Sequence, residues 1–254
     1  MPRRRLQLQK LYNARDLGGY PTLDGGVTRF GVFLRSEAPV ELPEEDVKAL
    51  LDYGVTASMD FRGKGERTNR PSDLREILPY YEKPLFNEAA MSQGRVRKMM
   101  QMDWGEQYVN MAESAREWAK EVLTIAAENP GVLLYHCTTG KDRTGLMSCY
   151  LLSIAGVDRT DIAADYCVSA IYLEPVFEKM RSGRMALGPK PENGEQPPAM
   201  PKFDNAFFET PASAMLNLVD YLRKQYGGVV EYLREIGVQE ETMDRIREKF
   251  VERA

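Results

Sequence analysis

The sequence predicts an α/β protein with a central, mostly parallel sheet flanked by helices and with a helical C-terminal part. Apolar runs alternate with amphipathic helical patterns through the first 155 residues. One run, VLLYH at 132–136, is continuously apolar up to its last residue, as a parallel strand covered on both faces requires. The remainder of the chain is mainly helical. Together these observations favour an open sheet whose functional loops follow the carboxyl ends of strands.

Turn and capping residues define the first elements. Residues 1–12 are expected to form a flexible tail, and the turn-rich NARDLGGY (13–20) follows it. DGG at 24–26 favours a hairpin between short strands near Tyr20 and at 32–35. Pro43 and the three acidic residues after it predict a helix that ends at Gly54. The tail is basic and contains Arg3, Arg4, Arg5 and Lys10.

The middle of the chain is expected to hold two strands and one long helix. VTASMD (55–60) predicts a buried strand, FRGKGERTNRPSD (61–73) a polar loop, and residues 80–86 a further strand. A single helix is predicted from Trp104 to Asn129, where Asn-Pro-Gly ends it. Its apolar residues recur at helical spacing and are Tyr108, Met111, Ala115, Trp118, Val122 and Ile125.

The second half begins with the VLLYH strand, a short loop, and a helix from Thr144 to about Ala155. Thr210 predicts another helix start, as an N-cap followed by Pro at the first helical position. Between these helices, residues 182–202 hold five prolines and three glycines and form either a flexible insertion or part of a lid. Residues 13–254 are expected to make one domain.

Composition excludes several classes of function. The chain has 254 residues and a net charge of −4, whereas general nucleic-acid binding requires a strongly basic face. One histidine, and three cysteines in no metal-binding spacing, exclude a histidine-rich metal site and a complete disulfide framework. No stretch approaches the ~20 apolar residues of a membrane span, and no apolar run follows the basic N-terminus as in a signal peptide. A cytoplasmic location is therefore expected.

The segment VLLYHCTTGKDRTG (132–145) carries the chemistry. The strand delivers Cys137 to its carboxyl end, five residues separate this cysteine from Arg143, and a helix then begins. A short strand-to-helix loop turns successive backbone N–H groups inward, and the helix N-terminus adds partial positive charge. Arg143 can hold two phosphate oxygens in a bidentate fork. We therefore expect a phosphate site lined by Thr138, Thr139, Gly140 and Lys141.

The same positive field favours the thiolate of Cys137, which becomes a nucleophile aimed at phosphorus. This predicts covalent catalysis through a thiophosphate intermediate that water hydrolyses, with no metal or other cofactor. Gly140 permits close backbone approach, and Thr144 is placed to hydrogen-bond the sulfur when it leaves. His136 is expected to be a buried imidazole that fixes the loop, with direct proton transfer as the alternative.

HCTTGKDRTG after an apolar strand resembles the C-x5-R-[ST]-G signature of the cysteine-based protein tyrosine phosphatase superfamily. With NARDLGGY upstream and YGGVVEYLREIGVQEETMDRIREKF near the end, the chain is similar to bacterial tyrosine, dual-specificity and phosphoinositide phosphatases that lack a WPD loop. The resemblance implies a phosphatase fold and a phosphorylated partner. This partner is a phosphotyrosine protein, a phosphoserine or phosphothreonine protein, or a phosphoinositide.

Other phosphate and thiol chemistries fit less well. A Walker loop requires Gly in place of Tyr135 and Ser or Thr in place of Asp142. A sulfurtransferase of the rhodanese kind is not expected to begin its helix with Arg-Thr-Gly. An arsenate reductase needs a second, resolving thiol. Cys149 and Cys167 are available, but both lie in helical patterns that are typical of buried, unreactive cysteines. A pseudophosphatase that binds phosphate without turnover is the main alternative, although a pure binder needs no thiolate.

The leaving group requires a general acid, and neither tryptophan is followed by Pro-Asp as in a WPD loop. Asp142, inside the loop, is the first choice for this acid, in line with the resembling family. The alternative is that Asp142 forms an ion pair that orients Arg143 or Lys141. Asp60, at the end of its predicted strand, is the second choice. The alternative is that Asp60 caps the strand end or pairs with Arg62.

The resemblance also suggests roles around the loop. Lys141 is expected to meet a second phosphate, as in phosphoinositide phosphatases, or only to raise the local potential. Asn13, Arg15 and Asp16 are expected to brace the loop, with a plain turn on Gly18-Gly19 as the alternative. Arg35 and Ser36, at a predicted strand end, are candidates for the same role.

Two further segments are candidates for contact with an anionic partner. GRVRKMMQMD (94–103) is expected to form an amphipathic helix, with a cover over the pocket or a peripheral contact with anionic lipid as alternatives. A basic loop after Asp60 is expected either to guide an anionic substrate or to be merely solvated. Its residues are Arg62, Lys64, Arg67 and Arg70.

Overall fold

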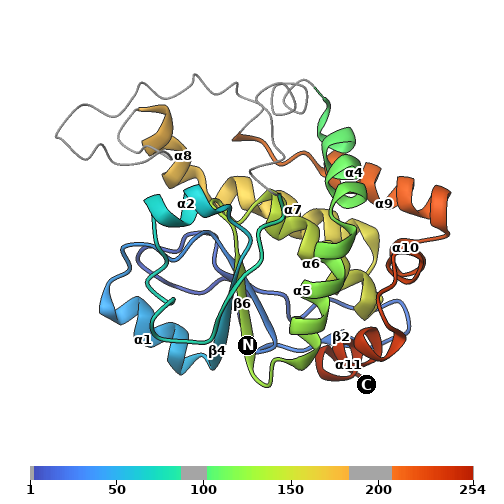
Figure 1. Ribbon diagram of the computed structural model, residues 1–254, viewed down its shortest axis with the longest axis horizontal. Helices are drawn as coiled ribbons and strands as arrows, with labels where there is room; N and C mark the ends of the chain where they lie inside the picture. Colours follow the sequence, from blue (N-terminus) through green and yellow to red (C-terminus); the bar gives the residue numbers. More distant parts are fainter. Residues whose placement is uncertain (1–2, 87–101, 183–207, 254) are drawn as a thin grey trace.

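The computed structural model describes residues 3–86, 102–182 and 208–253 (Figure 1). A five-stranded sheet in the order β1-β3-β6-β4-β5 forms its centre. Strands β3, β6, β4 and β5 run parallel, and β1 runs antiparallel to β3 at one edge, so the predicted fold class is confirmed. The strands are β1 (Arg15–Asp16), β3 (Phe33–Ser36), β4 (Val55–Asp60), β5 (Tyr80–Glu82) and β6 (Val132–His136).

Three parallel strands end at the same edge of the sheet. In the register of the sheet, His136 at the end of β6 pairs with Ser36 of β3 and with Asp60 of β4. The residues that follow these strands therefore leave the sheet side by side. This edge is where open α/β sheets bind ligands.

The two faces of the sheet are covered by different helices. Leu133 and Tyr135 of β6 belong to the large core under α4 (Trp104–Ser114), α5 (Arg116–Glu128) and α6 (Asp142–Ala155). Val132 and Leu134 point the other way and pack with Leu50 of α1 (Glu44–Asp52). Figure 1 shows α1 on one side of β4 and β6 and α5 on the other. The alternation follows from the two-residue period of a strand.

The C-terminal helices close the large core. α9 lies along α4 and α7, and α11 packs on α5 and α6 (Figure 1). The chain ends in β7 (Val251–Glu252), which pairs antiparallel with β2 (Val27–Thr28). The helices are α7 (Arg159–Tyr172), α8 (Glu174–Arg181), α9 (Ala212–Tyr226), α10 (Val229–Glu235) and α11 (Glu240–Phe250).

The predicted helix from Trp104 to Asn129 is two helices, because the backbone breaks at Ala115, where φ is −111° and ψ is 31°. No glycine or proline marks this break. Tyr232 of α10 donates its hydroxyl to the Ala112 carbonyl at 2.7 Å. In an unbroken helix that carbonyl would accept from the amide of residue 116. The Ala112 carbonyl accepts instead from the Ala115 amide at 3.3 Å, so a tighter turn and a tertiary contact coincide at the break.

The polar segment 61–73 is not a loop throughout, because α2 (Lys64–Asn69) lies within it. The Glu66 carboxylate accepts from the Gly63 amide at 2.9 Å and so stabilises the start of this short helix. The predicted strand at 80–86 is shorter and ends at Glu82.

Two predicted helix starts are displaced. The Thr210 hydroxyl donates to the Cys167 carbonyl at 2.8 Å instead of capping a helix, and Pro211 is the N-cap of α9. Helix α6 begins at Asp142, two residues before the predicted start.

The DGG hairpin turn forms, with Gly25 at a φ of 89° and the Thr22 amide bonded to the Gly26 carbonyl at 2.9 Å. The strand expected at 32–35 does not pair back across this turn, because β3 pairs with β1 and β6. The residues directly after the turn form β2 instead, which pairs with the C-terminal β7. The sequence did not indicate this long-range pairing.

The basic N-terminal segment makes specific contacts where the structure describes it. The Leu6 amide donates to the Ala14 carbonyl at 3.0 Å, and the Gln9 amide donates to Asp46 of α1 at 2.9 Å. These contacts differ from the flexible tail that its composition suggested, while the domain boundary after residue 12 stays a prediction. Residues 183–207 and 87–101 lie outside the described ranges, and with them the insertion at 182–202 and most of 94–103. No helix within the described ranges is long and apolar enough to cross a membrane.

Candidate active site

The loop between β6 and α6 begins at the carboxyl edge of the sheet. Cys137 follows the last residue of β6 and is 2% exposed. Arg143 lies in the first turn of α6. The strand end therefore fixes the position of the thiol, and the helix N-terminus adds a partial positive charge at the loop.

The loop carbonyls are bound from outside the loop. The Asn13 side-chain amide donates to the carbonyls of Thr139 and Gly140, each at 3.1 Å. The Arg35 guanidinium donates to the Gly140 carbonyl at 2.8 Å. Because the C=O and N–H groups of a trans peptide point in opposite directions, the amides that follow these carbonyls face the loop interior. Inward-facing amides of this kind form an anion-binding nest.

Gly140 is the residue that this loop conformation requires. Its φ is +67°, in the left-handed region that favours glycine. A Cβ at this position would lie 2.2 Å from the Ser36 carbonyl oxygen of the neighbouring strand end. The loop can therefore approach β3 only with glycine here.

A buried carboxylate fixes the two arginines behind the loop. Asp165 of α7 accepts from Arg15 Nε at 2.9 Å and from Arg35 at 2.5 Å. Burial raises the pKa of Asp165, but the two guanidinium groups outweigh it and lower that pKa to about 2. Asp165 lies in a helical pattern with no motif, 150 residues from Arg15, and sequence reasoning missed it.

Arg143 is held by a second residue that sequence reasoning missed. Glu66 of α2 accepts from Arg143 through both oxygens, at 2.6 and 2.8 Å, and also accepts from the Thr138 hydroxyl. Burial raises the pKa of Glu66, but the bonds from Arg143 and Thr138 outweigh it and lower that pKa to about 2. The one sequence signal for Glu66 is its spacing of three residues after Gly63, typical of a helix start.

The Glu66 contact occupies one edge of the Arg143 guanidinium. Both terminal nitrogens, Nη1 and Nη2, bind the carboxylate, and Nη2 also reaches the Thr138 hydroxyl at 3.1 Å. Nε has no hydrogen-bond partner among the described residues. The guanidinium is therefore oriented by Glu66 while its Nε edge stays open to an oxyanion.

Asp142 is the first residue of α6, and its side chain is 29% exposed. Its Oδ1 accepts from the hydroxyls of Tyr108 and Tyr166, at 3.2 and 3.3 Å. Lys141 Nζ lies 3.7 Å from the same oxygen, so the ion pair that was the alternative to a catalytic role is present with Lys141.

Asp60 is fully buried and its carboxylate is saturated. It accepts from the Arg62 guanidinium at 2.7 Å and 3.0 Å, and from the Tyr80 hydroxyl. Burial raises its pKa, but the charges of His136 and Arg62 and the bonds to Arg62 and Tyr80 outweigh it and lower that pKa to about 2. The Asp60 carboxylate therefore stays ionised and pairs with Arg62. This pairing is the alternative to a catalytic role that the sequence suggested.

His136 lies behind the loop with none of its surface exposed. Burial lowers its pKa to about 4, so the imidazole is neutral at pH 7. Its Nδ1 is 3.6 Å from Asp60, a distance beyond hydrogen bonding. The position agrees with a structural imidazole more than with a proton carrier.

Lys141 is 1% exposed, which differs from a solvated lysine at the loop surface. Its Nζ donates to the Glu209 carbonyl at 3.0 Å and lies 4.4 Å from the centre of the Trp104 ring. Burial lowers its pKa. Thr144 is also fully buried, and its hydroxyl has no hydrogen-bond partner in the part of the chain that the structure describes.

Other predicted residues lie away from the loop. Asp16 accepts from the Gly18 and Gly31 amides and so stabilises its own turn. Of the basic residues after Asp60, Arg62 is paired internally, and Arg67 pairs with Glu82 at 2.9 Å. These two pairings reduce the charge available to guide a substrate.

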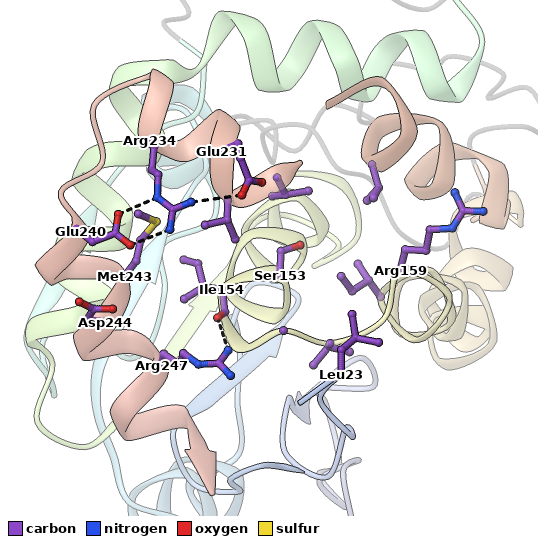
Figure 2. A pocket seen from close by; sticks show the side chains of 16 residues that line it. Leu23, Ser153, Ile154, Arg159, Glu231, Arg234, Glu240, Met243, Asp244 and Arg247 are labelled. Carbon is purple, nitrogen blue, oxygen red and sulfur yellow. Dashed lines mark hydrogen bonds and ion pairs between the residues drawn. The ribbon is translucent and has the colours of Figure 1, made fainter. Parts of the chain in front are cut away.

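A pocket of about 420 Å³ lies at the opposite end of α6, among the C-terminal helices (Figure 2). Arginine side chains at its rim are already bound by neighbouring carboxylates and a backbone carbonyl. Figure 2 shows Arg234 between Glu231 and Glu240, and Arg247 at the Ile154 carbonyl. None of the loop residues 137–144 lines it. We therefore place the candidate site at the loop, where nucleophile, cation and amides converge.

Comparison with known proteins agrees with this geometry. Residues 6–252 match the model of a family described as the tyrosine phosphatase family. The chain is 30% identical over 220 residues to a tyrosine-protein phosphatase of Nostoc commune, covering 85% of this chain and 72% of that protein. It is 30% identical over 129 residues to the triple specificity protein phosphatase PtpB of Mycobacterium tuberculosis, covering 50% of this chain and 45% of that protein.

Proposed function

Because the chain belongs to the tyrosine phosphatase family, we propose that it hydrolyses phosphomonoesters with Cys137 as nucleophile and Arg143 as phosphate clamp. One observation carries this proposal. The loop carbonyls of Thr139 and Gly140 are bound from outside, so the amides after them face the space beside Cys137. The Nε–H of Arg143, which has no partner among the described residues, adds a charged donor to the same anion.

The reaction has two steps. The Cys137 thiolate attacks phosphorus, forming the S–P bond, while the P–O bond breaks and Asp142 gives its proton to the leaving oxygen. Water then attacks phosphorus, Asp142 takes a proton from this water, and the S–P bond breaks to return the thiolate. The buried Thr144 hydroxyl is the donor we assign to the sulfur as it leaves. The amides and Arg143 stabilise the charge of the phosphoryl group, so chelators leave the rate unchanged.

Asp142 suits the role of general acid better than Asp60. Its side chain is 29% exposed and only Oδ1 is bound, whereas both oxygens of Asp60 are occupied by Arg62 and the group is fully buried. Asp60 instead orients Arg62 at the end of β4. Asp103, a third acidic candidate, caps α4 by accepting from the Glu106 amide at 2.9 Å.

For the substrate class, we propose phosphotyrosine proteins first. A second phosphate of an inositol lipid would require Lys141 as its partner. Lys141 instead contacts the Glu209 carbonyl and the Trp104 ring. Activity on phosphoserine and phosphothreonine is the second candidate, supported by the resemblance to a triple specificity phosphatase. A reducing compartment such as the cytoplasm suits a thiolate nucleophile.

The alternatives differ in the groups they need. An arsenate reductase requires a second reactive thiol, but burial raises the pKa of Cys149 to about 12. Burial also raises the pKa of Cys167, and its carbonyl anchors Thr210. A pseudophosphatase needs the amide nest and Arg143 but no proton donor, whereas here Asp142 has an open oxygen beside the loop.

The experiment compares phosphate release from a phosphotyrosine peptide, a matched phosphoserine peptide and a soluble phosphoinositide, using wild type and Cys137→Ser. We expect turnover that falls by more than about 10³-fold in Cys137→Ser, because the nucleophile is lost. Binding of vanadate or phosphate is retained in the variant, which shows that the loop is intact. Binding without turnover in wild type would identify a pseudophosphatase.

A further inference from the structure

Two buried tyrosines from different helices converge on Asp142. Tyr108 of α4 and Tyr166 of α7 are both fully buried, and their hydroxyls reach Asp142 Oδ1 at 3.2 and 3.3 Å. Their rings meet edge to face, with centroids 5.4 Å apart. Each ring therefore restricts the other, and the hydroxyls have little freedom to turn away from the carboxyl group.

The space for this arrangement is provided by Gly145, which lies one helical turn after Lys141. A Cβ at Gly145 would lie 3.3 Å from the Tyr108 hydroxyl and 3.3 Å from the Tyr166 ring. At this spacing a tyrosine would have to shift by a few tenths of an ångström. The glycine that follows Arg-Thr in the loop signature therefore lets both hydroxyls reach Asp142.

The contacts to Asp142 are asymmetric. Oδ1 accepts from both tyrosines and lies 3.7 Å from Lys141 Nζ, whereas Oδ2 has no partner among the residues that the structure describes. A protonated carboxyl group keeps one oxygen as a carbonyl acceptor and carries its proton on the other. Hydrogen bonds to Oδ1 are therefore compatible with the ionised and the protonated group alike, and they leave Oδ2 to exchange a proton.

The tyrosines can remain donors throughout a reaction cycle. Burial raises the pKa of Tyr108 and of Tyr166 well above the usual value. Neither hydroxyl gives up its proton to Asp142, so their part in the chemistry is to fix its orientation.

We propose that Tyr108 and Tyr166 are positioning residues that hold Asp142 by Oδ1 and direct Oδ2 at the leaving oxygen. This inference rests on the proposed function, because it assigns the orientation of the proposed general acid. It concerns the two proton transfers of Asp142, to the leaving oxygen and from the attacking water, and kcat/KM reports the first of them. Binding of the phosphoryl group by the loop and attack by Cys137 do not depend on it.

The test uses Tyr108→Phe, Tyr166→Phe and the double variant, with Tyr150→Phe as the matched control. Tyr150 lies in α6, is fully buried, and its hydroxyl has no hydrogen-bond partner in the described residues. For each protein, kcat/KM is measured with p-nitrophenyl phosphate, whose leaving group needs little protonation, and with an alkyl phosphate, whose leaving group needs a proton.

We expect each single variant to lower kcat/KM for the alkyl phosphate by about 5-fold, the effect of one lost hydrogen bond, and the double variant to lower it further. The value for p-nitrophenyl phosphate changes by less than about 2-fold, which also shows that the variants fold. Tyr150→Phe leaves both values unchanged. Equal losses on the two substrates, or no loss on either, would overturn the proposal.

An Asp142→Asn background shows whether the tyrosines act through Asp142. There, Tyr166→Phe should have no further effect on the alkyl phosphate, because the group that it positions no longer delivers a proton. A full additional loss would contradict the proposal. Failure of the proposed function looks different, since turnover would then be absent from wild type or would persist in Cys137→Ser.

Discussion

The Arg143 guanidinium is held at its two terminal nitrogens and has no hydrogen-bond partner at Nε among the described residues. Glu66 holds Nη1 and Nη2 through both of its carboxylate oxygens. The ion pair is partly buried, with 18% and 35% of the two side chains exposed, so screening by solvent is incomplete. Glu66 therefore fixes the orientation of the guanidinium.

Glu66→Gln should raise KM for a phosphate ester by about tenfold, because the neutral amide holds Arg143 less firmly. The change in kcat should be smaller, since Cys137 and Asp142 are not touched. The measurement is steady-state kinetics with p-nitrophenyl phosphate. Glu82→Gln is the control, because Glu82 is 51% exposed and accepts a single bond at 2.9 Å from Arg67, another arginine. An unchanged KM in Glu66→Gln would show that Arg143 orients itself without this partner.

His136 should titrate far below an ordinary histidine. Burial lowers its pKa to about 4 from a usual value of 6.5. The folded protein then binds fewer protons than the unfolded chain between these values, so the free energy of unfolding falls as the pH drops from about 6.5 to 4. Because the chain has one histidine, its ring signals in an NMR titration belong to His136 without assignment. A midpoint near 6.5 in the folded protein would contradict the burial argument.

At the scale of elements, α6 connects the loop with the C-terminal helices. Its first turn contains Arg143, and its last carbonyls, those of Ile154 and Ala155, accept from Arg247 of α11 at 3.0 and 2.7 Å. Arg247 also pairs with Asp24 at 2.5 Å. A cation at the C-terminus of a helix binds its unpaired carbonyls and opposes the negative end of the helix dipole.

Arg247→Ala should lower the free energy of unfolding by about 1–2 kcal/mol through loss of these bonds. The values of KM and kcat should stay within about 2-fold of wild type, because the loop end of α6 is held separately by Asn13 and Arg35. Thermal or denaturant unfolding measures the first effect and steady-state kinetics the second. A large fall in kcat at an unchanged stability would indicate coupling along α6 that the contacts do not explain.

The bounds of helices and strands could be predicted where residues close in the sequence determine them. The apolar run at 132–136 and the proline with acidic residues at 43–46 gave β6 and α1 nearly to the residue. The break at Ala115 was not predictable, because no glycine or proline marks it and its contact with the Tyr232 hydroxyl comes from a distant part of the chain. Helix α2 was missed because its stabilising residue, Glu66, lies in a segment rich in polar residues and glycine.

At the scale of the whole molecule, the site assembles from segments far apart in the chain. The loop itself is one continuous motif, so the sequence alone could indicate that Cys137 and Arg143 share one strand-to-helix loop. Its supports come from elsewhere: Asn13 and Arg35 from the N-terminal part, Glu66 from α2, and Asp165 from α7. A carboxylate that pairs with a distant arginine leaves no local spacing to detect, which is why Glu66 and Asp165 were not predicted.

The central claim is that Cys137 carries the phosphoryl group between the two steps. The most direct measurement is an acid quench of the wild-type protein during turnover of a radiolabelled phosphotyrosine peptide, followed by mapping of the label. We expect the label on the peptide that contains residue 137, and none in Cys137→Ser. Label on another residue, or phosphate release that continues in Cys137→Ser, would contradict the account.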